Sequence, residues 1–189
     1  IFSESQLSVM VSNDGTDTLN VSSISFPAGF TGSMADSILA PGEAADLTVS
    51  LAPEDNGYWT GDVLLTSDSY QQSEHSVALS ALSMNALLVH DFGGVLTGLS
   101  SDTTFTLNNT GNTDLVLDSL GTGHSSMTTD LIDGTSISSG GSQSILVTFA
   151  PVTADSVEGS VMLHTALGSI DFGSLAGDGW NWPEAQFAA

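Results

Sequence analysis

The strongest constraint on the fold is an internal repeat, because the sequence starts over at Met84. Between Met84 and Asp118 apolar and polar residues alternate, and an NNTGNT segment separates two alternating stretches. Such alternation predicts half-buried β-strands, and the Asn-Gly segment predicts a tight turn between them. The start of the chain has the same order, with SNDGTDT as its turn. Two copies of one domain are therefore expected.

The two copies can be aligned residue by residue, and no stretch shows helical periodicity. We therefore expect an all-β fold of two tandem immunoglobulin-like β-sandwich domains, residues 1–83 and 84–179, followed by a tail, residues 180–189. The aligned positions are Gly15, Leu19, Val21 and Ile24 with Gly111, Leu115, Leu117 and Leu120, and Gly42, Leu47, Val49, Leu51, Pro53, Gly61, Val63 and Leu65 with Gly140, Ile145, Val147, Phe149, Pro151, Gly159, Val161 and Leu163.

The second copy also carries a set of short motifs, HDFGGVLTG, FTLNNTGNTDLVLD, ILVTFAP and a closing LAGDG. In these it resembles the hydin-type, or ASH, immunoglobulin-like domain, and most of all the bacterial choice-of-anchor D repeats of secreted and surface proteins. The first copy matches the middle of this pattern with SNDGTDTLNV and LTVSLAP, but it ends in LSALS and has no FG-x-V strand. The resemblance implies a binding or structural module and transfers no catalytic residue.

The net charge of the chain limits the classes of partner that it can bind. It has 22 acidic residues and no Lys or Arg, which gives a formal net charge of −22. Nucleic acids and anionic lipids would be repelled, so cations and further copies of the chain are the better candidates. The same absence argues against the ciliary role known for eukaryotic relatives of this domain type. No apolar run reaches the roughly 18 residues of a membrane span, so we expect no membrane insertion.

The opening strand of the second copy, NALLVHDF, has no counterpart before Ile1. The end of the tail supplies one on paper, since EAQFAA joined to residue 1 gives EAQFAAIF, which aligns with NALLVHDF. We therefore expect the tail to act as the first strand of the next first domain, either in one longer polypeptide or between subunits joined head to tail. A linker, or a tail packed on its own domain, is the alternative. The predicted donor strand is Glu184, Ala185, Gln186, Phe187, Ala188 and Ala189, and the predicted acceptor edge is Ile1, Phe2, Val9 and Val11.

Polar turn residues are the candidate metal ligands. Asn13, Asp14, Asp17 and Asp114 offer the oxygen ligands that Ca²⁺ takes, although they lack the spacing of known calcium loops. The same residue types are also what tight turns require, so both readings stay open. No other cofactor is expected, because the chain has no Cys and its four His residues lack metal-ligand spacing.

Aromatic residues offer a second kind of site. Trp59, Trp180, Trp182, Tyr58 and Tyr70 could stack on sugars, or the tryptophans could pack between domains or subunits. No nucleophile motif such as GxSxG or HExxH is present, so we predict a protein that is not an enzyme. The function expected is a building block of an extracellular or cell-surface filament, stalk or repetitive adhesin. A sugar-binding or calcium-dependent module of a larger surface protein is the alternative.

Overall fold

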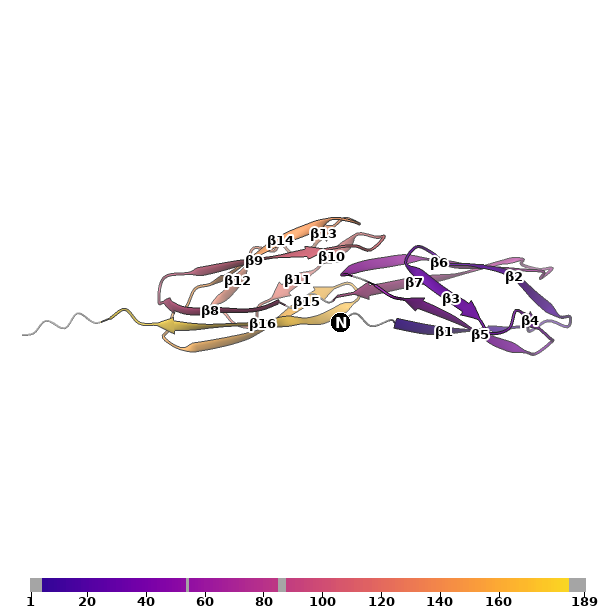
Figure 1. Cartoon of the computed structure of the whole chain (residues 1–189), viewed down its shortest axis with the longest axis horizontal. Coiled ribbons are helices and arrows are strands. Elements are labelled where there is room, and N and C mark those ends of the chain that lie inside the picture. The colour runs from indigo at the N-terminus through magenta and orange to yellow at the C-terminus, as the bar shows by residue number, and fades with distance from the viewer. Residues whose placement is uncertain (1–4, 54, 85–87, 184–189) are drawn as a thin grey trace, which may run out of the picture. The chain divides into compact units, whose positions relative to one another are not determined.

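A computed structural model describes residues 5–53, 55–84 and 88–183, and every regular element within them is a β-strand (Figure 1). Contacts divide the chain into two compact units. Unit 1 comprises Ile1–Ser83 with Thr110–Thr113, and unit 2 comprises Met84–Asn109 with Asp114–Ala189. Within the described residues no helix is present that could cross a membrane.

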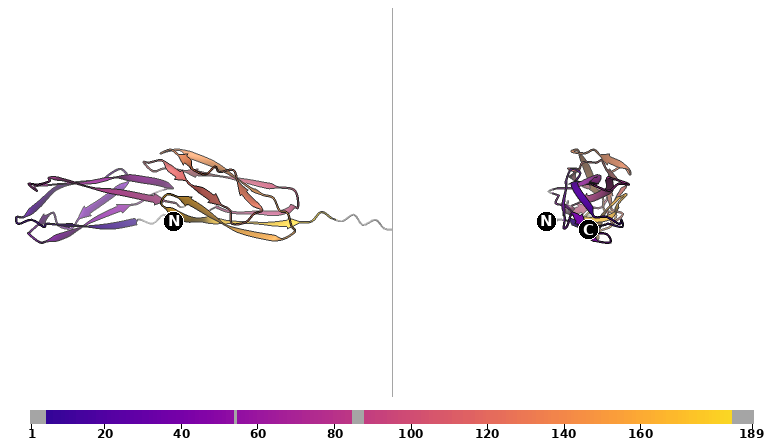
Figure 2. Two further views of the ribbon diagram at one scale, coloured as in Figure 1. Left: turned by 180° about the vertical axis from the view of Figure 1, so that it is seen from behind. Right: turned by 90° about the vertical axis from the view of Figure 1, so that its right-hand side faces the viewer.

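Unit 1 consists of two antiparallel sheets (Figures 1 and 2). The first has the order β1-β5-β3 and the second the order β4-β2-β6-β7. The strands are β1 (Ser5–Ser12), β2 (Leu19–Ser25), β3 (Phe30–Met34), β4 (Ile38–Leu39), β5 (Ala44–Leu51), β6 (Gly57–Ser67) and β7 (Glu74–Ser83).

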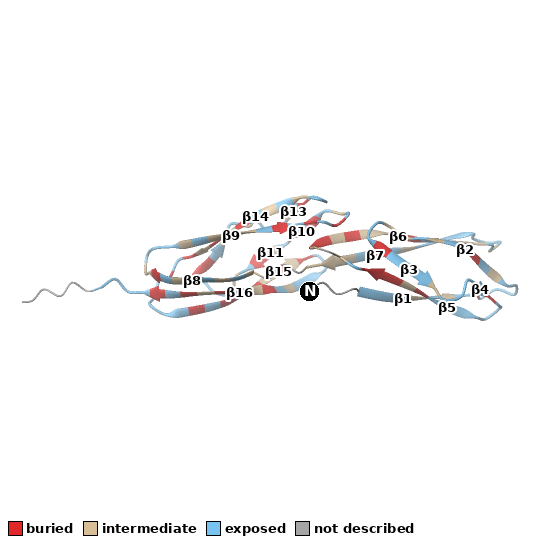
Figure 3. Cartoon of the chain, viewed as in Figure 1, coloured by how far each residue is buried: buried red, intermediate tan, exposed pale blue. Residues whose placement is uncertain are grey.

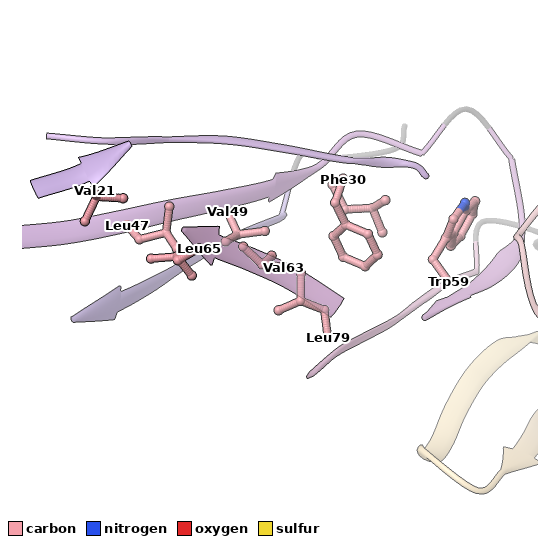
Figure 4. Close-up of a cluster of buried hydrophobic side chains, with 9 residues drawn as sticks. Val21, Phe30, Leu47, Val49, Trp59, Val63, Leu65 and Leu79 are labelled. Atoms are coloured by element: carbon pink, nitrogen blue, oxygen red, sulfur yellow. The ribbon is translucent and has the colours of Figure 1, made fainter. Parts of the chain in front are cut away.

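Both sheets of unit 1 contribute to one hydrophobic core (Figure 4). Leu47 and Val49 on β5 belong to the same buried cluster as Val63 and Leu65 on β6, each at alternate positions of its strand. The alternation follows from the pleat of a strand, which turns every second side chain to the same face. Burial of each such side chain contributes about 1.5–3 kcal/mol, so this cluster is what makes unit 1 a sandwich.

Unit 2 repeats this arrangement (Figure 2). It has one sheet of order β12-β14-β9, a second of order β11-β15-β16-β8, and a short pair, β10-β13. The strands are β8 (Leu88–Leu96), β9 (Ser101–Asn108), β10 (Leu115–Leu117), β11 (Ser119–Gly121), β12 (Met127–Thr129), β13 (Thr135–Ile137), β14 (Ser142–Phe149), β15 (Ser156–Thr165) and β16 (Gly168–Trp180).

Aromatic contacts join the two main sheets of unit 2. The rings of Phe105 on β9 and Phe172 on β16 have centroids 5.7 Å apart, and those of Phe92 on β8 and Phe149 on β14 are 5.5 Å apart. Phe149 and Phe172 are almost fully buried. Buried positions alternate with exposed or partly buried ones along β14 and β15 (Figure 3). Unit 2 is therefore also a sandwich.

A difference in side-chain size explains Gly177, one of the closing glycines of the second copy. A Cβ atom on Gly177 would lie 2.6 Å from Cε1 of Phe149, so only glycine fits beside that ring. In unit 1 the aligned residue for Phe149 is the smaller Leu51, and the position equivalent to Gly177 is Ala81. The first copy can therefore end in LSALS and keep the same fold.

Candidate interaction site

The opening strand of the second copy is β8, and it pairs in parallel with the closing strand β16. The register places Leu88 beside Gly173 and Val89 beside Ser174. A side chain at Gly173 would collide with the backbone of Leu88, so the glycine permits this close approach. The closing strand of unit 2 is thus paired along both edges, by β15 and by β8.

The closing strand of unit 1 is β7, which stands at the end of its sheet. In the alignment of the two copies, Gly61 and Val63 on β6 correspond to Gly159 and Val161 on β15. Gly61 pairs with Leu79 on β7, and Gly159 pairs with Leu175 on β16, so Leu79 and Leu175 are equivalent. Within the described residues β7 pairs with β6 alone, because no strand of unit 1 corresponds to β8. The order β1-β5-β3 corresponds to β9-β14-β12, and β6-β7 corresponds to β15-β16. Unit 2 differs at this edge, and also in that β10 and β13 form a separate pair whereas β2 and β4 belong to the larger sheet of unit 1.

Two of the predicted acceptor residues lie on β1, in the other sheet of unit 1. Val9 pairs with Leu47 and Val11 pairs with Ala45, and both side chains pack, partly buried, against the core. The remaining acceptor residues, Ile1 and Phe2, and the whole predicted donor strand, residues 184–189, lie outside the described residues. The donor and acceptor assignments therefore stay predictions.

The turn residue Asn13 is buried, with 5% of its surface exposed. Its Nδ2 donates hydrogen bonds of 2.8 Å to the carbonyls of Leu39 and Asp17, and its Oδ1 accepts one of 3.0 Å from the Gly15 N–H. Asn109 is fully buried at the equivalent position of unit 2 and donates from Nδ2 to the Ile137 carbonyl at 2.8 Å. Both asparagines thus tie a turn to the neighbouring strand, and alignment of the two copies is the signal that could have identified them.

The other three calcium candidates, Asp14, Asp17 and Asp114, are exposed. Oδ1 of Asp114 accepts a hydrogen bond of 3.3 Å from the Ser139 N–H. In the part of the chain that the structure describes, no three His, Asp or Glu side chains form a group that could hold a metal ion. Calcium binding by these residues stays a prediction, whereas Asn13 has a role in the turn.

The aromatic residues separate into two sets. Trp59 is buried beneath Gly29, where a Cβ atom would lie 2.6 Å from Cδ1 of the indole, so it is a core residue and not part of a surface platform. Trp180 and Trp182 are exposed at the end of unit 2 by 59% and 58% of their surface.

The two exposed tryptophans are held in place by the neighbouring turn. The Trp180 ring lies over Gly94, where an added Cβ atom would come within 2.8 Å of Cε2. Trp182 donates from Nε1 to the Thr97 carbonyl at 3.0 Å, and the Thr97 N–H in turn donates to the Trp180 carbonyl at 2.7 Å. We call Trp180 and Trp182 the tryptophan pair.

Two sandwiches in tandem, each built of two main sheets that pack around a core of their own, define the chain as an immunoglobulin-like module. The description "HYDIN/CFA65/VesB-like, Ig-like domain" matches residues 1–81 and again residues 85–172. The chain belongs to this family, and the predicted all-β fold of two immunoglobulin-like domains is confirmed. The hydin-type resemblance seen in the sequence is confirmed with it.

Comparison with solved structures gave matches of low identity and low TM-score. A protein of unknown function from Porphyromonas gingivalis W83 is 18% identical with a TM-score of 0.38, over 93% of this chain and 91% of that one. The VesB protease of Vibrio cholerae is 16% identical with a TM-score of 0.36, over 43% of this chain and 27% of that one. The D0-D1 domain of Intimin is 11% identical with a TM-score of 0.27, over 93% and 87% of the two chains. A comparison with curated proteins gave no match.

Proposed function

We propose that this chain is a structural building block of an extracellular or cell-surface filament, stalk or repetitive adhesin, and that it is not an enzyme. Its copies follow one another head to tail, as separate subunits or as periods of a longer polypeptide. The observation that carries the proposal is the difference between β16, which is paired along both edges, and β7, which is paired along one edge in the described residues. An unpaired strand edge is a ready template for another strand.

The aligned sequence of the tail supports the same proposal. EAQFAAIF, read from residue 184 through residue 189 into residue 1, follows the pattern of NALLVHDF, which contains the start of β8. Head-to-tail addition of identical units builds a linear assembly when the rotation between successive units does not close a ring. A surface rich in Ser, Thr and Asn with no Lys or Arg also offers no cleavage site to proteases that require a basic residue, which suits an extracellular setting.

A joined chain tests the proposal in both arrangements. Two copies are linked so that residue 189 of the first is followed directly by residue 1 of the second, and unfolding is compared with that of the single chain. About five strand hydrogen bonds at ~1 kcal/mol each, with ~2–3 kcal/mol for burial of Phe187, should stabilise the second unit 1 before ordering costs. The matched control is the same joined chain with Phe187→Ser in its first copy.

Sedimentation velocity of the single chain over a range of concentrations gives the second readout. Assembly that is lost when residues 184–189 are removed supports subunits joined head to tail. A joined chain whose second unit 1 gains no stability, together with a single chain that stays monomeric, would overturn the proposal.

A sugar-binding role is the second candidate, and the tryptophan pair is the observation that favours it. Both rings are exposed and held in fixed positions by Gly94 and Thr97. Aromatic faces suit the C–H surfaces of sugars, and rings that are already ordered lose little freedom on binding. Titration of the chain with a panel of soluble oligosaccharides, followed by tryptophan fluorescence, tests this role. Tyr70→Ala is the control variant, because Tyr70 is a fully exposed aromatic residue in unit 1.

A further inference from the structure

We propose that the outer edge of β7, from Val77 to Leu79, binds the end of the tail, residues 187–189, of another copy of this chain as a parallel strand. This inference rests on the proposed head-to-tail function and specifies which edge accepts the strand. It differs from the acceptor predicted from the sequence, which includes Val9 and Val11 on β1.

Unit 2 shows which edge the first strand uses. There β8 lies beside the closing strand β16, whereas β9, the counterpart of β1, stands at the end of its own sheet with β14 as its partner. By the same arrangement the first strand of unit 1 belongs beside β7, the counterpart of β16. The outer edge of β1 is not the equivalent position.

The direction and register follow from the same comparison. Because β8 and β16 are parallel, the added strand should run parallel to β7. In unit 2, Val89 on β8 lies beside Ser174 on β16. The residue of β7 equivalent to Ser174 is Ala78, and the tail residue aligned with Val89 is Ala188. The expected register therefore places Ala188 beside Ala78 and Ala189 beside Leu79.

The side chains of the two segments fit this register. Ser174 and Val89 are both exposed in unit 2, and Ala78 is exposed in unit 1, so Ala188 would face solvent. Its neighbours in the tail, Phe187 and Ala189, would then face the core, as the partly buried Leu88 and His90 do. Val77 occupies the position of Gly173, and β7 lacks the register shift found beside that glycine, so close pairing should begin at Ala78.

The charges fit as well. The chain carries a net charge of −22 and has no basic residue to offset it. The segment from Val77 to Leu79 nevertheless contains no Asp or Glu, and neither does the end of the tail from Phe187 to Ala189. Two uncharged strips can meet without the repulsion that the rest of this surface would impose.

Cysteine cross-linking tests the edge and the register together. The natural chain has no cysteine, so every disulfide that forms joins engineered positions, and a dilute sample favours the link within one joined chain. In the joined chain, Ala188→Cys in the first copy is combined with Ala78→Cys in the second, and mild oxidation is followed on non-reducing gels. The matched control combines Ala188→Cys with Ser8→Cys, because Ser8 is an exposed residue of β1.

The expected result is rapid cross-linking of the Ala78 variant and several-fold less of the Ser8 variant. Preferential linking to Ser8, or equal linking of both, would overturn the β7 edge. Stabilisation of the same joined chain, measured without cysteines, reports on the proposed function separately. A stabilised chain without the Ala78 link thus refutes this inference and leaves the proposed function standing.

Discussion

Replacement of Asn13 by alanine should destabilise unit 1 strongly for a single turn residue. The side chain donates two hydrogen bonds of 2.8 Å and accepts one of 3.0 Å, and the bond to the Leu39 carbonyl is buried. Loss of the donor to the buried Leu39 carbonyl costs about 1–3 kcal/mol. The bonds to the Asp17 carbonyl and from the Gly15 N–H are only partly buried, so water can replace them in part, and the loss of each costs about 0.5–1.5 kcal/mol. The expected loss is therefore roughly 2–6 kcal/mol.

Asn13→Asp separates this role from calcium binding. A carboxylate cannot donate to the Leu39 and Asp17 carbonyls, and it would place a charge at a buried position. The structural role predicts that aspartate is worse than alanine. A calcium site would instead gain a charged oxygen ligand, so Asn13→Asp would bind Ca²⁺ more tightly and be stabilised by it.

Urea unfolding followed by the fluorescence of Trp59 provides the assay, because Trp59 is the buried tryptophan of unit 1. The background carries Trp180→Phe and Trp182→Phe to remove the signal of unit 2. With a slope of about 1–1.5 kcal/mol/M for a unit of this size, the midpoint should fall by at least about 1.3 M. Asn20→Ala, at an exposed position of β2, is the control and should shift stability by less than about 0.5 kcal/mol. An Asn13→Ala midpoint that matches the control would refute the reasoning.

Three further predictions concern the glycine, the acidic turns and the tryptophan pair. Gly177→Ala should cost about 1–3 kcal/mol by overpacking against Phe149, and adding Phe149→Leu should relieve that strain; circular dichroism during urea unfolding measures both. EDTA should leave the melting temperature unchanged if the acidic turns are structural, and a clear fall would establish a bound calcium ion. If the chain binds sugars, Trp182→Ala should weaken binding about tenfold in calorimetric titration while Tyr70→Ala does not, because a well-placed aromatic contact contributes about 1 kcal/mol beyond the area it buries.

The fold could be predicted from the sequence because its signal is local. Alternation in segments such as DLTVSLAP and ILVTFAP marks strands, and the two copies support each other at the same positions. The role of Asn13 was less accessible, since an asparagine in a turn can serve a metal, a turn or the core, and only its burial decides. Trp59 presented the same ambiguity, because nothing in its neighbouring residues shows that it lies beneath Gly29.

The edge of β7 as the acceptor of the added strand could not be predicted from the sequence, for a different reason. Alternation shows which face of a strand is buried, but it does not show which strands are neighbours. Alignment of the tail with the start of β8 could suggest a donor strand, while the choice between β1 and β7 as its acceptor depends on sheet order. That choice required the pairing of β8 with β16 to be seen.

The charge of the chain adds a condition that any head-to-tail contact must meet. With 22 acidic residues and no Lys or Arg, two copies cannot attract each other through ion pairs, so their association must rest on strand hydrogen bonds and apolar contact. Added salt screens the repulsion between like charges and leaves those contacts in place. Association measured by sedimentation should therefore strengthen as NaCl rises from low to physiological concentration. Weakening over that range would show that the contact depends on electrostatic attraction, which the strand-pairing mechanism cannot supply.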